Sequence, residues 1–299
     1  MQAGRLSVLV AAFVSGCSGS STSGFGLDDA GKSSSSLLHT GDGGAHHVEA
    51  STLSQPDSAQ QMMASSGPAV VYGQSDTTLY AVDPDTKAVT AIADFSGCDS
   101  AVIDIALDKS SKMYGTTFGG VYTIDTTTAV CTLLATGTYP NSLSFVPVGT
   151  LDPTEEALVG YNGSTYVRID TTTGNVTTVG DLGKGYSSSG DIVSVIGGGT
   201  YLTVTGGDAC SQYDCLVEVD PVTGALKTNY GPIGYSEVYG LAFWAGTVYG
   251  FDSAGDLFQV TFTGSKANVT AIPIPSAPAG LSFYGAGSTT SAPPVATAK

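Results

Sequence analysis

The stretch LVEVDPVTG at residues 216–224 joins a run rich in apolar and β-branched residues to a turn that begins at Asp220. β-Branched residues favour a strand, and an aspartate side chain can bond its own backbone two residues on, so the stretch predicts a strand followed by a hairpin turn. The same pattern occurs four times, with its aspartates at Asp83, Asp125, Asp170 and Asp220. These aspartates are 42, 45 and 50 residues apart, which predicts a structural repeat in which the carboxylates form turns rather than catalyse a reaction.

A second motif recurs in step with the first, namely a four-residue apolar core whose third member is small. The small residues are Ala106, Ser144, Ser194, Ala242 and Ser282. With a fifth, degenerate copy of the first motif at 257–261, each repeat of about 44 residues holds four short strands, which is typical of a β-propeller blade. Closing some twenty strands into a ring would also remove the long open edges of a flat sheet.

The phase of the repeat predicts how the ring closes. The first element, residues 69–74, begins at the second strand of a unit, and the last element, residues 280–284, is an inner strand with nothing after it. We therefore predict an all-β propeller at 68–287, with five four-stranded blades closed by the C-terminal strand, and a disordered tail at 288–299. A β-sandwich would lack the repeat, and a β-helix usually has shorter coils.

The repeats resemble those of a known group of propellers. The segments LYAVDPDT at 79–86, GLAF at 240–243 and VYG at 248–250 are similar to the repeats of secreted bacterial propellers of the NHL and YVTN-like type. They also resemble the lipoprotein propellers of predatory and soil bacteria. The resemblance spans residues 69–287 and implies an architecture. Since such propellers include hydrolases, lyases, quinoproteins and binding modules, it does not define an activity.

The N-terminus has the features of a targeting segment. Arg5 precedes an apolar run of about nine residues, too short for a bilayer span of roughly 20, which predicts a signal peptide at 1–16. The small residues before Cys17 resemble a bacterial lipobox, which implies that Cys17 is acylated, palmitate included, and anchors the chain to the outer membrane or cell surface. An ordinary signal peptide with a chance cysteine is the alternative. Residues 17–67, rich in Ser and Gly, are predicted to be a disordered linker.

Charge and histidine placement exclude several functions. The chain has 10 Lys and Arg against 26 Asp and Glu, a formal charge of −16, so it repels the phosphates of a nucleic acid. All three histidines, His39, His46 and His47, precede the predicted propeller. A Ser-His-Asp or Cys-His nucleophile or a His-ligated metal therefore cannot form on it. We predict no cofactor and no metal site. The placement of the histidines does not exclude a Ca²⁺ ion bound by oxygen ligands.

The remaining cysteines form an even set once Cys17 is set aside. Cys210 and Cys215 flank a short hairpin loop that can bring them within disulfide range, and Cys98 and Cys131 bracket most of the second blade. We predict disulfides Cys98–Cys131 and Cys210–Cys215, formed in an oxidising compartment.

A candidate binding face lies on the loops that lead from each outer strand to the next inner strand, since these loops surround the axial opening. Tyr139, Tyr186 and Tyr235 lie in three of these loops, with Tyr239 just beyond. Tyrosine combines an apolar face with a hydroxyl group, which suits the recognition of a glycan, a peptide or an envelope protein. The alternative is that each ring folds back onto its own blade.

A catalytic alternative rests on the acids at the starts of the inner strands, Asp104, Asp191 and Glu237. A glycosidase needs two carboxylates in one cleft, and these three could line the axial mouth. The competing interpretation is that they are solvated loop acids. Our leading hypothesis is a lipid-anchored, non-enzymatic binding module of the cell envelope, and an envelope hydrolase or lyase is the alternative.

The anchor can be tested directly. Changing Cys17 to Ser removes the thiol that would carry the acyl chains, so we expect the variant to lose membrane partitioning while the wild type keeps it. Detergent phase separation of the expressed proteins measures this. A wild-type protein that partitions into the aqueous phase would show that the chain is not a lipoprotein.

Overall fold

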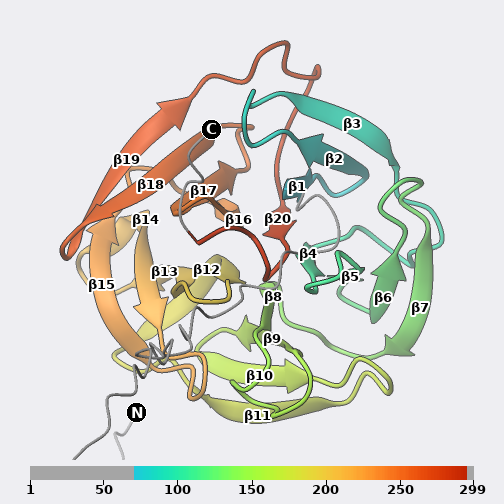
Figure 1. The fold of residues 1–299 in the computed structure, drawn as a ribbon, viewed down its shortest axis with the longest axis horizontal. Helices are drawn as coiled ribbons and strands as arrows, with labels where there is room; N and C mark the ends of the chain where they lie inside the picture. Colours follow the sequence, from blue (N-terminus) through green and yellow to red (C-terminus); the bar gives the residue numbers. More distant parts are fainter. Residues whose placement is uncertain (1–70, 295–299) are drawn as a thin grey trace, which may run out of the picture. The chain divides into compact units, whose positions relative to one another are not determined.

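The computed structural model describes residues 71–294, and these form five four-stranded antiparallel sheets (Figure 1). The predicted signal peptide, Cys17 and the linker at 17–67 lie outside the described residues. Within the described part, no helix is long and apolar enough to cross a membrane.

Each blade runs from an inner strand to an outer strand. Blade 1 contains β20 (Gly285–Ser288), β1 (Val71–Gln74), β2 (Thr78–Val82) and β3 (Val89–Asp94). Blade 2 contains β4 (Asp104–Leu107), β5 (Met113–Thr116), β6 (Gly120–Ile124) and β7 (Cys131–Thr136). Blade 3 contains β8 (Leu143–Val146), β9 (Ala157–Asn162), β10 (Thr165–Ile169) and β11 (Val176–Asp181). Blade 4 contains β12 (Tyr186–Ser194), β13 (Thr200–Gly206), β14 (Cys210–Val219) and β15 (Leu226–Pro232). Blade 5 contains β16 (Val238–Trp244), β17 (Thr247–Asp252), β18 (Leu257–Thr263) and β19 (Lys266–Ile272).

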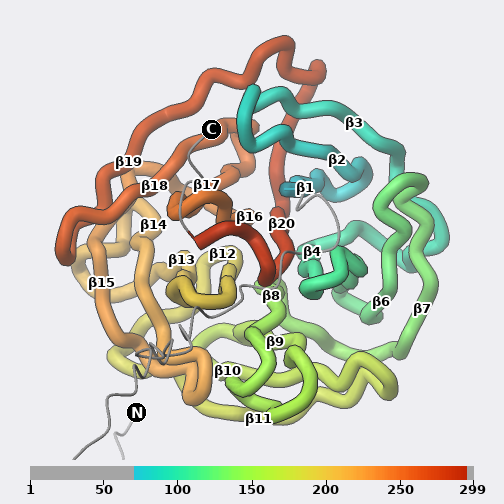
Figure 2. Tube along the Cα trace, viewed as in Figure 1, coloured from blue at the N-terminus to red at the C-terminus, as the bar shows by residue number. Residues whose placement is uncertain are grey.

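The blades are arranged around a central axis. The five inner strands β20, β4, β8, β12 and β16 meet at the centre, and the outer strands β3, β7, β11, β15 and β19 form the rim (Figure 2). The prediction of an all-β propeller with five four-stranded blades is therefore confirmed.

The core is divided into five apolar clusters, each lying between two neighbouring blades. The cluster between blades 3 and 4, for example, contains Tyr161, Tyr166 and Val204, all fully buried. Each blade therefore presents an apolar layer to both neighbours, and the short inner strands β4 and β8 are buried along their whole length. Because burying one large apolar side chain stabilises a protein by about 1.5–3 kcal/mol, the ring is held by packing between blades.

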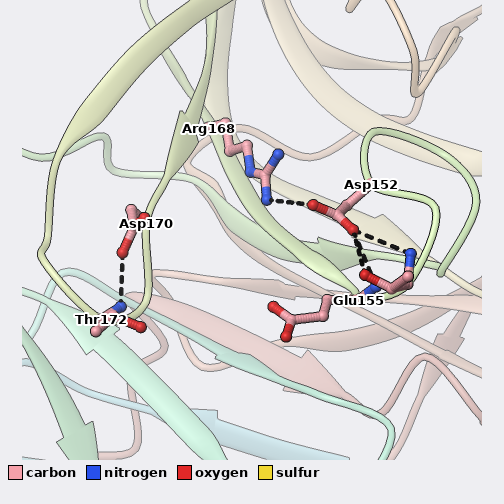
Figure 3. A network of polar contacts seen from close by, with 6 residues as sticks. Asp152, Glu155, Arg168, Asp170 and Thr172 are labelled. Atoms are coloured by element: carbon pink, nitrogen blue, oxygen red, sulfur yellow. Dashed lines mark hydrogen bonds and ion pairs between the residues drawn. The ribbon is translucent and has the colours of Figure 1, made fainter.

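The repeated aspartates form the turns between third and outer strands. Asp170 Oδ1 accepts a hydrogen bond from the backbone N–H of Thr172 at 2.8 Å (Figure 3). It accepts a second from the N–H of Thr173, also at 2.8 Å. At Asp83, Asp125 and Asp220 the carboxylate likewise accepts a hydrogen bond from the backbone N–H of the residue two positions later. In blade 5, which lacks the aspartate, β18 and β19 are joined by two residues with Gly264 at φ 61°. The turn interpretation agrees with this geometry.

In three of these turns the hydrogen bonds also lower the pKa of the aspartate, namely Asp83, Asp125 and Asp170. At Asp125, bonds from the hydroxyl and backbone N–H of Thr127 lower the pKa to about 2, and the Thr128 backbone N–H adds to them. A neighbouring loop uses the same chemistry, since Asp152 accepts from the backbone of Thr154 and also from Arg168 at 3.2 Å (Figure 3). The Thr-rich turns therefore fix the hairpins through local bonds on the surface.

Blade 1 is built from both ends of the propeller. β20 pairs antiparallel with β1, with Val71 opposite Ser288 and Gln74 opposite Gly285. Closure by a C-terminal strand is thus confirmed, but the strand spans 285–288 and not the predicted 280–284. At the axis there is no space for larger residues, since a Cβ on Gly285 would lie 2.4 Å from Asp104 Oδ1.

The fifth copy of the apolar motif, around Ser282, does not form an inner strand but packs between two blades. Ala106, Ser144, Ser194 and Ala242 lie on inner strands as predicted, whereas Ser282 lies in the segment before β20. Next to it, Phe283 is fully buried and its ring centre lies 5.0 Å from that of Phe251. The apolar residues of this motif therefore fill the space between blades 5 and 1.

The packed chain extends beyond the predicted boundary at 287. Thr289, Thr290 and Ala292 are buried, and Thr289 Oγ1 donates to the backbone carbonyl of Asp108 in blade 2 at 2.8 Å. Residues 288–292, assigned to the disordered tail from the sequence, therefore belong to the propeller. The stretch also reaches blade 4, where the N–H of Ile196 donates to the carbonyl of Thr290 at 2.9 Å, although its small, polar composition does not reveal these contacts.

Both predicted disulfides are confirmed. Cys98 and Cys131 have Cα atoms 5.2 Å apart, and their bond ties the connection that enters blade 2 to that blade's outer strand. Cys210 and Cys215 have Cα atoms 5.4 Å apart and both lie in β14, where their bond spans the stretch at which the pairing of β14 with β13 shifts register.

Ring closure can be tested by truncation. A chain ending at Pro278 lacks Phe283 and β20, so β1 loses its inner neighbour and two blade interfaces lose buried side chains. Since removing one buried Phe side chain costs about 3–5 kcal/mol, we expect a melting temperature lower by more than about 10 °C, or no cooperative transition. A chain ending at Pro294 is the control. Equal melting curves for the two truncations would contradict closure by β20.

Candidate functional site

The two ends of the ring differ in which loops they present. Because neighbouring strands are antiparallel, the loops before each inner strand and the loops between second and third strands lie at the same end, which we call the entry face. It comprises the loops 75–77, 95–103, 117–119, 137–142, 163–164, 182–185, 207–209, 233–237, 253–256 and 273–284. The remaining loops form the exit face.

A depression of about 380 Å³ lies on the entry face. Loops or strand ends of four blades line it, with the side chains of Asp76, Phe118, Asn141, Tyr239 and Tyr284 and the segment 101–103. Phe118 and Tyr284 expose 74% and 41% of their surface. This combination of a few polar groups with aromatic faces is typical of small-molecule and peptide sites.

Two of the rings form a pair. The planes of Tyr239 and Tyr284 lie at 12° to one another, with their centres 6.0 Å apart. Tyr239 is the second residue of β16, and Tyr284 immediately precedes β20, so neighbouring inner strands position both rings. Two of the aromatic rings that line the depression are therefore held in place by inner strands.

Of the predicted tyrosines, only Tyr239 lines this depression. Tyr139 is buried, and its hydroxyl donates to the carbonyl of Gly174 at 3.0 Å, so it fills the interface between blades 2 and 3. The proposed exposed platform is wrong for this residue, because a tyrosine in a short connection can reach the apolar layer beside it.

Tyr186 and Tyr235 are half-buried and engaged elsewhere. The Tyr186 hydroxyl accepts from Asn229 Nδ2 at 3.1 Å, and the Tyr235 ring stacks on Phe258 with centres 4.1 Å apart. The four tyrosines are thus not brought together into one surface.

Phe118 and Tyr284 are the site residues that the sequence reasoning missed. Phe118 is followed by two glycines in a short turn, and an aromatic residue in such a turn is a signal for an exposed ring. Tyr284 was assigned to the predicted strand 280–284, so the error in register concealed its position at the mouth of the ring.

Asp104 and Asp191 lie inside the ring and are completely buried. Asp104 Oδ2 accepts from the backbone N–H of Leu143 in blade 3 at 2.6 Å. Asp191 Oδ2 accepts from the N–H of Leu241 in blade 5, also at 2.6 Å. Each carboxyl also accepts the N–H of the residue that follows it. Both aspartates therefore join the inner strand of one blade to that of the next.

The two buried carboxyl groups interact with one another. Burial raises the pKa of Asp104 well above its usual range, and the charge of Asp191 raises it further. Burial also raises the pKa of Asp191, although hydrogen bonds from Asp104 and from backbone N–H groups oppose this. Since two adjacent buried carboxylates repel, the pair retains a proton well above the pH at which an exposed aspartate loses it.

Glu237 is separate from this pair. It is exposed at the entry face and accepts a hydrogen bond from Ser253 Oγ at 2.5 Å. The predicted catalytic set of Asp104, Asp191 and Glu237 is therefore not assembled in an open cleft, because two of its members are internal supports of the ring.

Comparisons with known proteins add the following. No family model matches the sequence, and no curated protein matches it. The fold is similar to that of a protein of unknown function from Bacteroides caccae, with TM-score 0.39 and 11% identity over 68% of this chain and 73% of that one. It is also similar to BamB from Moraxella catarrhalis, with TM-score 0.33 and 12% identity over 67% of this chain and 71% of that one.

The shared proton predicts a pH dependence of stability. A raised pKa in the folded state stabilises the protein at low pH, and this contribution is lost as the pH rises toward the folded-state pKa. One retained proton makes the unfolding free energy fall by about 1.4 kcal/mol per pH unit above the usual aspartate range. In the double variant Asp104→Asn with Asp191→Asn, no carboxyl group of the pair is left to hold a proton, so we expect a lower stability near pH 5 but a flatter slope.

Urea unfolding from pH 5 to 9 measures both quantities. Ser144→Ala, which removes an uncharged oxygen between inner strands, is the control and should lower stability without changing the slope. An unchanged slope in the double variant would mean that the pair does not hold a proton.

Proposed function

We propose that this protein is a non-enzymatic binding module of the bacterial cell envelope, and that its ligand enters the depression on the entry face. The observation that carries this proposal is the exposure of Phe118 and Tyr284 at the rim of a depression with polar groups beside them. Exposed aromatic side chains gathered in a hollow are a common mark of interaction sites, because burying them on binding releases water from apolar surface.

Support for an envelope location comes from the disulfides. Two disulfides are characteristic of chains that fold in an oxidising compartment, so the protein is exported. The finer part of the proposal is a lipid anchor on Cys17, at the outer membrane or cell surface. Cys17 lies outside the described residues, and its substitution by serine tests this part.

An envelope hydrolase or lyase is not favoured by the geometry. Such an enzyme would present two carboxylates to one open cleft. Asp104 and Asp191 have no exposed surface and their oxygens are occupied by backbone N–H groups, while Glu237 lies apart. The binding module is therefore the better account of the site.

The proposal is tested with arrays of glycans and peptides probed with the full-length protein. For any probe that binds, we expect Phe118→Ala and Tyr284→Ala to weaken binding about tenfold or more, as truncation of an aromatic anchor does. Both residues are exposed, so stability should change by no more than about 0.5 kcal/mol.

Val222→Ala is the matched control, because Val222 is also apolar and 51% exposed but lies on the exit face. It should bind as the wild type does. Binding that is unaffected by the two aromatic substitutions, or reduced equally by Val222→Ala, would show that the depression is not the site.

A further inference from the structure

The basic residues are distributed unequally between the two faces. Of the ten Lys and Arg in the sequence, Arg5, Lys32 and Lys299 lie outside the described residues, which leaves seven. Six of these seven lie in or beside the exit-face loops, namely Lys87, Lys109, Lys112, Arg168, Lys227 and Lys266. Among the described residues, only Lys184 lies on the entry face, and it does not line the depression.

The acidic residues, in contrast, are divided almost equally between the two faces. Apart from the buried pair at the axis, nine acids lie at the entry face, namely Asp76, Asp94, Asp99, Asp181, Asp208, Asp214, Glu237, Asp252 and Asp256. Ten more lie at the exit face, where the six bases offset them. With one base against nine acids the formal charge is −8 at the entry face, and with six bases against ten acids it is −4 at the exit face.

Carboxylates surround the aromatic side chains of the depression. Asp76 lines it and is exposed. Asp99 accepts from the Thr117 hydroxyl at 2.7 Å, beside Phe118, and this bond lowers its pKa, so it stays charged. Burial raises the pKa of Tyr239, and the negative charges of Glu237 and Asp214 raise it further. The rings thus lie in a negative potential.

We infer that the ligand of the entry-face depression is cationic, namely a peptide segment that carries Lys or Arg side chains. This inference rests on the proposed function and names the chemical class of its ligand. A cation is attracted both to the faces of Phe118, Tyr239 and Tyr284 and to the carboxylates of Asp76, Asp99 and Glu237. A neutral sugar would use the rings alone, and an anionic one would be repelled.

The test uses labelled octapeptides of alternating Gly-Arg, Gly-Gln and Gly-Glu, with cellohexaose as a neutral sugar, on the full-length protein. We expect the Gly-Arg peptide to bind and the Gly-Gln and Gly-Glu peptides not to bind. Raising the salt from 50 to 300 mM should weaken binding several-fold, because exposed charges are screened. The double variant Asp76→Asn with Glu237→Gln should weaken binding at least tenfold and reduce the salt dependence.

Two further variants separate a built site from general attraction to an acidic chain. Tyr284→Ala keeps every charge and should weaken Gly-Arg binding, whereas Glu155→Gln removes one exposed charge on the exit face and should not. Gly-Arg binding that ignores Tyr284→Ala, or that falls as much in Glu155→Gln as in Glu237→Gln, would overturn the inference.

The inference can fail while the proposed function stands. If cellohexaose or the Gly-Gln peptide binds, loses affinity in Tyr284→Ala and is indifferent to the double variant, the depression is a binding site for a neutral ligand. If no probe binds the wild type, a cationic peptide is excluded as the ligand.

Discussion

Five inner strands share one axis, and each is the edge of its sheet, so backbone N–H groups at the centre need partners from the next blade. Side-chain oxygens supply them at four of the five junctions. Asp104 accepts from Leu143, Ser144 from Ser194, Asp191 from Leu241, and Ser288 from Phe243. At the remaining junction, between blades 1 and 2, Leu107 forms a parallel backbone bridge with Thr289. Only short side chains fit there, which explains the Gly-Ala-Gly-Ser sequence of β20.

The need for acceptors at the axis explains why two of the predicted catalytic acids have a structural role. A carboxylate is a strong acceptor, and at the axis it can bond the N–H groups of two strands at once, which offsets part of the cost of burying it. The aspartates that seemed best placed for catalysis are thus used to join blades. The chemistry left for a ligand lies one layer outward, where Tyr239, Tyr284 and Phe118 surround the mouth of the ring.

Much of the fold could be predicted from the sequence because its determinants are local. The strand–Asp–turn pattern depends on bonds within three residues, and the Cys210–Cys215 pair on one hairpin. The site could not, because it depends on contacts between blades. Whether Tyr139 is exposed is decided by Gly174, 35 residues away, and the position of β20 by the space beside Asp104. Leu281 and Phe283 imitate the inner-strand motif, whereas β20 itself has no large apolar residue to reveal it.

The pairing of β20 with β1 joins residues at opposite ends of the propeller, and it has a kinetic consequence. The loop that closes when Gln74 meets Gly285 has little effect on the equilibrium, since closure entropy grows only with the logarithm of loop length. The pairing of β20 with β1 has a larger effect on when the ring can close during synthesis. During synthesis blade 1 remains three-stranded, with β1 as an open edge, until β20 has emerged. Ring formation is therefore a late, non-local step, and before it the chain exposes an edge that can pair with other molecules.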